Sequence, residues 1–308
     1  MTHFLPGVTD PIDRPEVWPP TIELRRGADS IAEHLAALRT VAAARFTPTY
    51  HRGRGIVYVG GGAYWPGIVV GIRMLRGTGC KLPVEVWYRG SCEPVNPADV
   101  ADLDVWLIDA EKCPLSNRVK FSTVDRGGWE SKLYALSLTM FNEVLFLDAD
   151  AYCVTDPVPL FDLLTEREPL VFWEDMPNQV HSIAWDRVWP DGTGRVPTFQ
   201  GGQFLIDLHS GWRTLAVAHW MCQHSDYYFG ALYGDQDCWR VALAATGAGF
   251  RSLGPADWEA PAFVCRHDGA PYVVHRCQSK MFVGKPGPRA ESLPGEARAW
   301  ELFASLTV

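Results

Sequence analysis

Two aspartates, Asp148 and Asp150, directly follow an apolar segment at 143–147. An apolar run of this length predicts a buried strand, and open α/β sheets bind their ligands at the carboxyl ends of such strands. Carboxylate oxygens are preferred ligands of hard divalent cations, which keep open positions for phosphate oxygens. The pair therefore indicates a site for Mn²⁺ or Mg²⁺, with an aspartate-rich turn that caps the next element as the structural alternative.

Five further residues could complete such a site. His275 ends an apolar run and could supply a third ligand nitrogen, while Lys280 could neutralise phosphate charge. Lys132 lies near the start of the helix predicted before the aspartates, where a cation could meet a diphosphate or a sugar. Asp235 and Gln236 begin another predicted helix and could bind sugar hydroxyls or cap that helix. Each of these residue types is also common in purely structural roles.

Three glycines, Gly60, Gly61 and Gly62, follow the first predicted strand. Glycines there let the backbone approach a ligand closely, and Tyr64 could lie against a nucleobase. The spacing is not G-x-G-x-x-G, so the nicotinamide-type fingerprint is absent.

A candidate acceptor surface lies at the end of a later strand, at Trp173, Glu174 and Asp175. The long Gly/Pro/Asp-rich loop that follows, at about 176–197, carries His181 and could act as a lid. Glu174 or Asp175 could orient an acceptor hydroxyl, or could simply be solvated acids.

The scaffold predicted for these residues alternates strands with helices. Apolar runs bounded by Gly, Pro or Asp predict strands, and apolar residues at helical spacing predict helices. The predicted strands are at 55–60, 84–88, 105–108, 143–147, 170–173, 204–207 and 272–275, and the predicted helices at 30–45, 65–75, 129–141, 212–225 and 236–246. This alternation implies a mostly parallel sheet covered by helices on both faces.

We expect one α/β domain at 28–308, preceded by a proline-rich arm at 1–27. Its nucleotide-binding half would span about 55–150 and its acceptor-binding half about 151–285.

Composition narrows the function classes. The net charge of -8 and the absence of a basic cluster argue against a nucleic-acid surface. No apolar run approaches the length of a membrane span, and the first residues lack signal-peptide zones, so we expect a cytoplasmic location. The 8 cysteines form no C-x-x-C pair, which favours free thiols.

The order of the motifs resembles retaining GT-A glycosyltransferases of the glycogenin and lipopolysaccharide galactosyltransferase group. It is still more similar to the fungal α-mannosyltransferase (MNN1-like) family. The residues that carry the resemblance, over about 55–285, are Gly60-Gly-Gly62, Ile72-Arg-Met-Leu75, Leu82-Pro-Val-Glu85, Asn142-Glu-Val-Leu-Phe-Leu-Asp-Ala-Asp150, Phe199-Gln-Gly-Gly-Gln-Phe-Leu-Ile-Asp207, Gly234-Asp-Gln-Asp237 and His275 with Lys280.

The resemblance implies a GT-A fold, a single Rossmann-like domain, and a metal-dependent activity. A hexose would move from a nucleoside-diphosphate sugar, with a UDP-sugar favoured and GDP-mannose second, to a hydroxyl of a glycan, natural-product or peptide acceptor. The anomeric configuration would be retained, and we favour front-face attack, in which the leaving phosphate takes the acceptor proton. The composition and the lack of an anchor also suggest a bacterial source.

The resemblance also implies roles for particular residues. Asp148 would contact the ribose and the metal, Ala149 would line the donor site, and Asp150 and His275 would complete the metal ligands. Lys132 and Lys280 would stabilise the departing diphosphate.

On the donor-sugar side, Gly201 and Gly202 would lie under the sugar, Asp235 would bind its hydroxyls, and Gln236 would face the anomeric carbon. The spacing from the histidine to Lys280 is one residue shorter than in the family, which makes Lys285 an alternative.

Two other classes fit parts of the pattern. A haloacid-dehalogenase-type phosphatase also has a strand that ends in D-x-D, with the first aspartate as nucleophile. About 140 residues precede the strand here, whereas such phosphatases begin with it. A non-catalytic protein that binds nucleotide-sugars or glycans is the second alternative, and the intact Asp148, Asp150, Gln236 and His275 argue against it.

Overall fold

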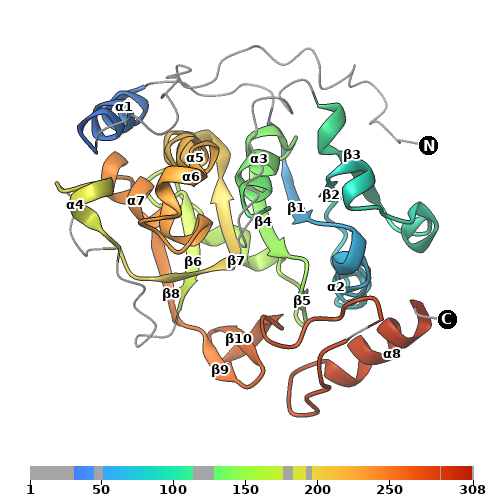
Figure 1. The fold of residues 1–308 in the computed structure, drawn as a ribbon. Coiled ribbons are helices and arrows are strands. Elements are labelled where there is room, and N and C mark those ends of the chain that lie inside the picture. Colours follow the sequence, from blue (N-terminus) through green and yellow to red (C-terminus); the bar gives the residue numbers. More distant parts are fainter. Residues whose placement is uncertain are drawn as a thin grey trace.

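The computed structural model describes residues 31–44, 51–113, 128–175, 183–191, 196–284 and 286–306. The predicted arm at 1–27, His181 and Lys285 lie outside these ranges. Within the described residues, helices cover both faces of a central sheet, and a second, smaller sheet lies at one edge of the molecule beside the last helix (Figure 1).

The central sheet has 7 strands in the order β3-β2-β1-β4-β7-β6-β8. The strands β3, β2, β1 and β4 are parallel, β7 runs antiparallel between β4 and β6, and β8 is parallel to β6. Their bounds are Arg54–Val59 for β1, Val84–Tyr88 for β2, Val105–Asp109 for β3, Glu143–Asp148 for β4, Leu170–Glu174 for β6, Phe199–Asp207 for β7 and Arg251–Pro255 for β8. The prediction of an α/β fold with a mostly parallel sheet is confirmed.

Alternate residues of the strands enter two separate cores. Val57 packs in the core that includes α3, α5 and α7, whereas its neighbours Ile56 and Tyr58 pack in the core that includes α2. Side chains of a strand point alternately to the two faces of the sheet, so a strand buried on both faces must be apolar throughout. This is why these strands are continuous apolar runs in the sequence.

Eight α-helices surround the sheet in the described part of the chain. Their bounds are Ile31–Ala43 for α1, Trp65–Gly77 for α2, Glu130–Leu138 for α3, Trp185–Val188 for α4, Leu208–Gln223 for α5, Ser225–Tyr228 for α6, Asp235–Thr246 for α7 and Glu296–Leu306 for α8. The helix α5 begins before the predicted 212 because the Asp207 carboxylate accepts a hydrogen bond from the His209 N–H and caps it.

A small antiparallel sheet, in the order β5-β11-β10-β9, brings distant segments to the end of β4. Its strands are Ala151–Cys153 for β5, Asp257–Glu259 for β9, Ala262–His267 for β10 and Ala270–His275 for β11. Ala151 pairs with His275, so the residue that follows Asp150 fixes the position of the histidine. Pairing of β5 with β11 thus joins sequence positions more than a hundred residues apart at one point.

Candidate functional site

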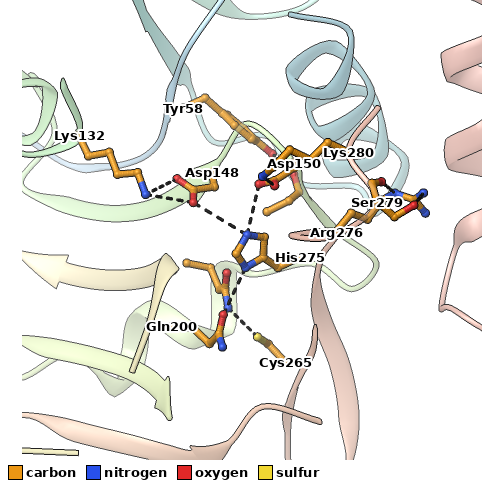
Figure 2. Close-up of polar contacts among 12 residues, drawn as sticks. Tyr58, Lys132, Asp148, Asp150, Gln200, Cys265, His275, Arg276, Ser279 and Lys280 are labelled. Atoms are coloured by element: carbon orange, nitrogen blue, oxygen red, sulfur yellow. Dashed lines mark hydrogen bonds and ion pairs between the residues drawn. The ribbon is translucent and has the colours of Figure 1, made fainter. Parts of the chain in front are cut away.

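Asp148, Asp150 and His275 form one cluster at the carboxyl end of β4. Asp148 is the last residue of that strand, and the chain then turns into β5, which pairs with β11. Figure 2 shows the histidine ring lying between the two carboxylates: its Nε2 is 3.3 Å from Asp150 Oδ1 and 3.9 Å from Asp148 Oδ2. The sequence predicted this set of residues, and the structure brings all three together.

The donor set of this cluster suits a divalent cation. One ligand atom from each residue lies within 4.8 Å of the other two. Two carboxylates and an imidazole nitrogen match Mn²⁺ or Mg²⁺ better than a soft metal, which would need thiolates. Gly202 of β7 creates the necessary space, because a Cβ there would lie 2.6 Å from His275 Cε1.

Lys132 of α3 forms ion pairs with Asp148, a candidate metal ligand, and with Asp235 at the start of α7. Its Nζ lies 2.9 Å from Asp148 Oδ1 and 3.4 Å from Asp235 Oδ2. Burial alone would lower the pKa of Lys132, but the attraction of Asp148 and Asp235 outweighs burial and raises it above its usual value. A permanently charged ammonium therefore lies beside the metal-binding residues.

Lys280 contacts Asp150, another of the three candidate metal ligands, because its ammonium forms an ion pair with that carboxylate. Burial raises the pKa of Asp150, but His275 and Lys280 lower it more strongly, so the net pKa is well below that of an ordinary aspartate. Lys280 and Lys285 were the two alternatives for the lysine that follows the histidine and binds the diphosphate. Lys280 lies at the site, and Lys285 falls outside the described residues.

Asp235 is the first residue of α7 and is 5% exposed. Burial raises its pKa to about 6, Lys132 partly opposes this effect, and the negative charge of Asp148 adds to it. Gly234 allows this approach, with φ of 139° and with the ring of Trp129 where its Cβ would be.

Asp237, a further acid of the same motif, has a structural position. It is 1% exposed and receives hydrogen bonds from the Tyr233 N–H and from Arg240 Nη1, at 2.9 and 3.1 Å. It is therefore not placed to act as a nucleophile.

A chain of hydrogen bonds connects the metal-binding histidine with Gln236. His275 Nδ1 lies 3.3 Å from Gln200 Oε1, and Gln200 Nε2 donates to Asp175 Oδ1 at 2.6 Å. Gln236 Nε2 donates to the other oxygen, Asp175 Oδ2, at 3.2 Å. Gln200 was not predicted as a site residue, although strand alternation places it on the same face of β7 as Gly202, which lies against His275.

The other predicted acceptor residues lie away from this chain. Trp173 is completely buried, and its indole donates to the Arg266 carbonyl at 2.6 Å. Glu174 accepts a hydrogen bond from Ser252 Oγ at 2.5 Å. The structure therefore brings only Asp175 of the three to the metal-binding cluster, and Trp173 has no surface with which to touch an acceptor.

A pocket opens beside the cluster, with about 620 Å³ of empty space that continues into solvent. Its lining consists of Val59, Gly60, Tyr64, Glu93, Gly128, Trp129, Ser131, Lys132, Asp148, Ala149, Asp150 and Lys280. Tyr64 is 42% exposed and lies edge-on to Phe282. An aromatic face and two lysines thus line one cavity with the metal-binding acids.

The predicted glycines lie around this pocket and under α7. Gly60 has φ of 138°, which glycine adopts readily, and the structure leaves no room for a side chain on Gly61, whose Cβ would be 2.2 Å from the Glu93 carbonyl oxygen. Gly62 begins a short 3-10 helix, and a Cβ on Gly201 would lie 3.1 Å from Gln236 Cβ. Close backbone approach is thus a feature of both sides of the site.

Comparison with known sequences and structures identifies the class. Residues 53–186 match the model of a family described as "Mannosyltransferase putative". The structure of the galactosyltransferase LgtC in complex with donor and acceptor sugar analogs superposes with a TM-score of 0.58 and 16% identity, covering 82% of this chain and 96% of that one. The chain has the GT-A fold, and the resemblance to glycosyltransferases that the motifs indicated is confirmed.

Curated relatives come from two fungi. The chain is 32% identical over 138 residues to alpha-1,2-mannosyltransferase MNN24 of Candida albicans, a match of 41% of this chain and 18% of that protein. It is 29% identical over 145 residues to alpha-1,2-mannosyltransferase MNN5 of Saccharomyces cerevisiae, which covers 44% of this chain and 22% of that protein. The match therefore spans only about a fifth of each relative. These similarities support the prediction that the chain is a glycosyltransferase.

Two expectations from the sequence are wrong. We expected a bacterial and cytoplasmic enzyme, but the relatives are alpha-1,2-mannosyltransferases of two fungi, and this finding overturns both expectations. Among the residues that the structure describes, no helix is both long and apolar enough to cross a membrane.

Proposed function

We propose that this chain is a metal-dependent glycosyltransferase that moves a hexose from a nucleoside-diphosphate sugar to an acceptor hydroxyl with retention of configuration. The observation that carries the proposal is the cluster of Asp148, Asp150 and His275, flanked by Lys132 and Lys280 and open to one pocket. A diphosphate carries negative charge that these cations would bind. The phosphatase alternative loses its support, because the fold is GT-A and not that of a haloacid dehalogenase.

Different residues would bind the diphosphate and the nucleoside of the donor. Asp148, Asp150 and His275 would hold Mn²⁺ or Mg²⁺, which as a Lewis acid would withdraw charge from the diphosphate. Gly60 and Tyr64 would face the nucleoside, because both line the pocket beside the metal-binding cluster.

Transfer requires a group that stabilises the leaving diphosphate and a group that stabilises the sugar. Lys132 and Lys280 remain charged at neutral pH and would bind the phosphate charge that develops as the glycosidic bond breaks. Asp235 would bind a sugar hydroxyl, and the Gln236 carbonyl would face the anomeric carbon. In a front-face reaction the acceptor hydroxyl attacks from the side of the leaving phosphate, which takes its proton.

We propose mannose as the transferred sugar and GDP-mannose as the donor, which reverses the preference for a UDP-sugar that the resemblance implied. The support is the similarity to alpha-1,2-mannosyltransferases and the match of residues 53–186 to the family described as "Mannosyltransferase putative". The matched residues include the pocket residues from Val59 to Asp150. A glycan hydroxyl would then be the acceptor.

The first test is thermal stability with Mn²⁺ and GDP, UDP or dTDP, because a ligand that binds only the folded state raises the melting temperature. We expect a metal-dependent increase with GDP that is absent in Asp150→Ala. Asp102→Asn is the matched control, since Asp102 pairs with Arg73 on the surface. An increase with UDP alone would change the donor base, and no increase with any nucleotide would overturn the proposed donor site.

A further inference from the structure

We propose that Asp175 is a positioning residue that sets the orientation of two side-chain amides at once, Gln200 and Gln236, and through Gln200 the tautomer of His275. The inference builds on the proposed function, since it assigns how two parts of that site are held ready. It replaces the expectation that Asp175 contacts the acceptor.

Asp175 and Gln200 are buried, and Gln236 is half-buried. Asp175 is 8% exposed and lies directly after β6, where its backbone N–H bonds to the Thr198 carbonyl at 2.8 Å. Gln200 is 4% exposed and donates to Oδ1, while Gln236 donates to Oδ2. An ionised carboxylate only accepts hydrogen bonds, so each glutamine must present its NH₂ group to Asp175.

The first consequence concerns the histidine. With its NH₂ on Asp175, Gln200 presents its carbonyl oxygen to His275 Nδ1. A carbonyl cannot donate, so Nδ1 must carry a proton, which leaves Nε2 as the ring nitrogen that can bind a metal. That Nε2 is the nitrogen that faces Asp148 and Asp150 (Figure 2). The acid thus fixes the tautomer that can bind a metal.

The second consequence concerns the amide at the start of α7. Because Gln236 commits its NH₂ to Asp175, its carbonyl oxygen is the end that remains for the donor sugar. A carbonyl oxygen, with its partial negative charge, stabilises positive charge at an anomeric carbon, whereas an NH₂ group would oppose it. One carboxylate therefore prepares both the metal-binding end and the sugar-binding end of the site.

The decisive variant is Asp175→Asn, which keeps the shape of the side chain but offers one acceptor and one donor. It can no longer accept from both amides, so at least one glutamine must turn around. If Gln200 turns, the His275 ring must protonate on Nε2 and metal affinity falls. If Gln236 turns, the turnover falls with little change in donor affinity. The matched control is Glu174→Gln, which removes the same charge from the adjacent residue, bound to Ser252.

We would measure Mn²⁺ affinity by titration, kcat and KM for donor and acceptor, and the protonated nitrogen of His275 by ¹⁵N NMR on metal-free protein. We expect Asp175→Asn to lower Mn²⁺ affinity or kcat by about 10- to 100-fold, the usual effect of losing a partner behind a metal ligand. Wild-type protein and Glu174→Gln should both show the proton on Nδ1.

Two results would overturn the inference. A variant Asp175→Asn that changes only the acceptor KM, with wild-type metal affinity and kcat, would overturn the inference in favour of an acceptor contact. A wild-type His275 with no proton on Nδ1 would overturn it as well. If no Mn²⁺ or nucleotide binds to the wild type, the proposed function fails, while the NMR comparison still decides whether Asp175 sets the tautomer.

Discussion

Gly202 lies directly against the ring of His275. A Cβ at position 202 would fall 2.6 Å from His275 Cε1 and 2.9 Å from Asp148 Oδ2, closer than non-bonded atoms approach. The glycine is in the middle of β7, where it has no unusual φ. Its role is therefore spatial: it lets a strand pass under two candidate metal ligands.

Gly202→Ala should displace His275 or Asp148 and lower Mn²⁺ affinity at least about tenfold, at a cost of about 1–3 kcal/mol in the free energy of unfolding. Titration calorimetry and chemical denaturation would measure the two effects. Gly77→Ala is the control, because nothing lies within 4 Å of a Cβ on that helical glycine. Wild-type Mn²⁺ affinity in Gly202→Ala would show that the ligands tolerate the methyl group and that the close approach has no role in metal binding.

Asp235→Asn should stabilise the protein at neutral pH while it abolishes transfer. The folded-state pKa of Asp235 is raised from 3.8 to about 6, so between these values the folded protein holds more protons than the unfolded one. Stability therefore falls as the pH rises through this window, and the ionised carboxylate costs about 3 kcal/mol above it. An amide does not ionise and avoids this cost.

Chemical denaturation at pH 4 and pH 8 tests whether ionisation of Asp235 lowers the stability of the wild type relative to the variant. We expect the variant to match the wild type at pH 4 and to exceed it by up to about 3 kcal/mol at pH 8. Asp102→Asn, at an exposed aspartate, should show no such gain. A variant that is less stable than the wild type at pH 8 would mean that the ion pair with Lys132 outweighs burial. A gain in stability with loss of activity is typical of residues kept for function.

The parallel strands and the metal-binding cluster could be predicted because their signals are local or ordered along the chain. The strand β4 is an uninterrupted apolar run that ends in Asp148, and His275 ends another. By contrast, β5 has 3 residues, too few for a period, and β8 is half-exposed and contains a glycine and a proline. Such strands exist because a neighbouring strand pairs with them, which no local pattern shows.

The contacts within the site were harder to predict than its members. Which carboxylate each lysine would pair with, and that Asp175 would receive two amides, depend on where β6, β7 and α7 meet. Trp173 was misjudged because an aromatic residue at a strand end fits a binding surface and a core equally well, and here it is in the core. Only the three-dimensional arrangement separates these possibilities.

A buried ion pair holds the segment that follows the histidine against α8. Arg276 is buried and forms an ion pair with Glu296 of α8, in which both side chains are 1% exposed. Glu296 also accepts hydrogen bonds from Tyr152 and Trp300, at 3.2 and 2.8 Å. Removing one partner of such a pair leaves an uncompensated buried charge, which costs far more than the pair itself contributes.

Glu296→Ala should therefore lower the free energy of unfolding by about 3–5 kcal/mol. Glu301→Ala, in the same helix, should change it by less than about 1 kcal/mol, because the Arg298–Glu301 pair is 65% and 67% exposed. Since Arg276 adjoins His275, the first variant should also weaken Mn²⁺ binding at temperatures where it is still folded. Equal stabilities of the two variants would mean that the charge of Arg276 is neutralised elsewhere, and that α8 does not hold the histidine segment in place.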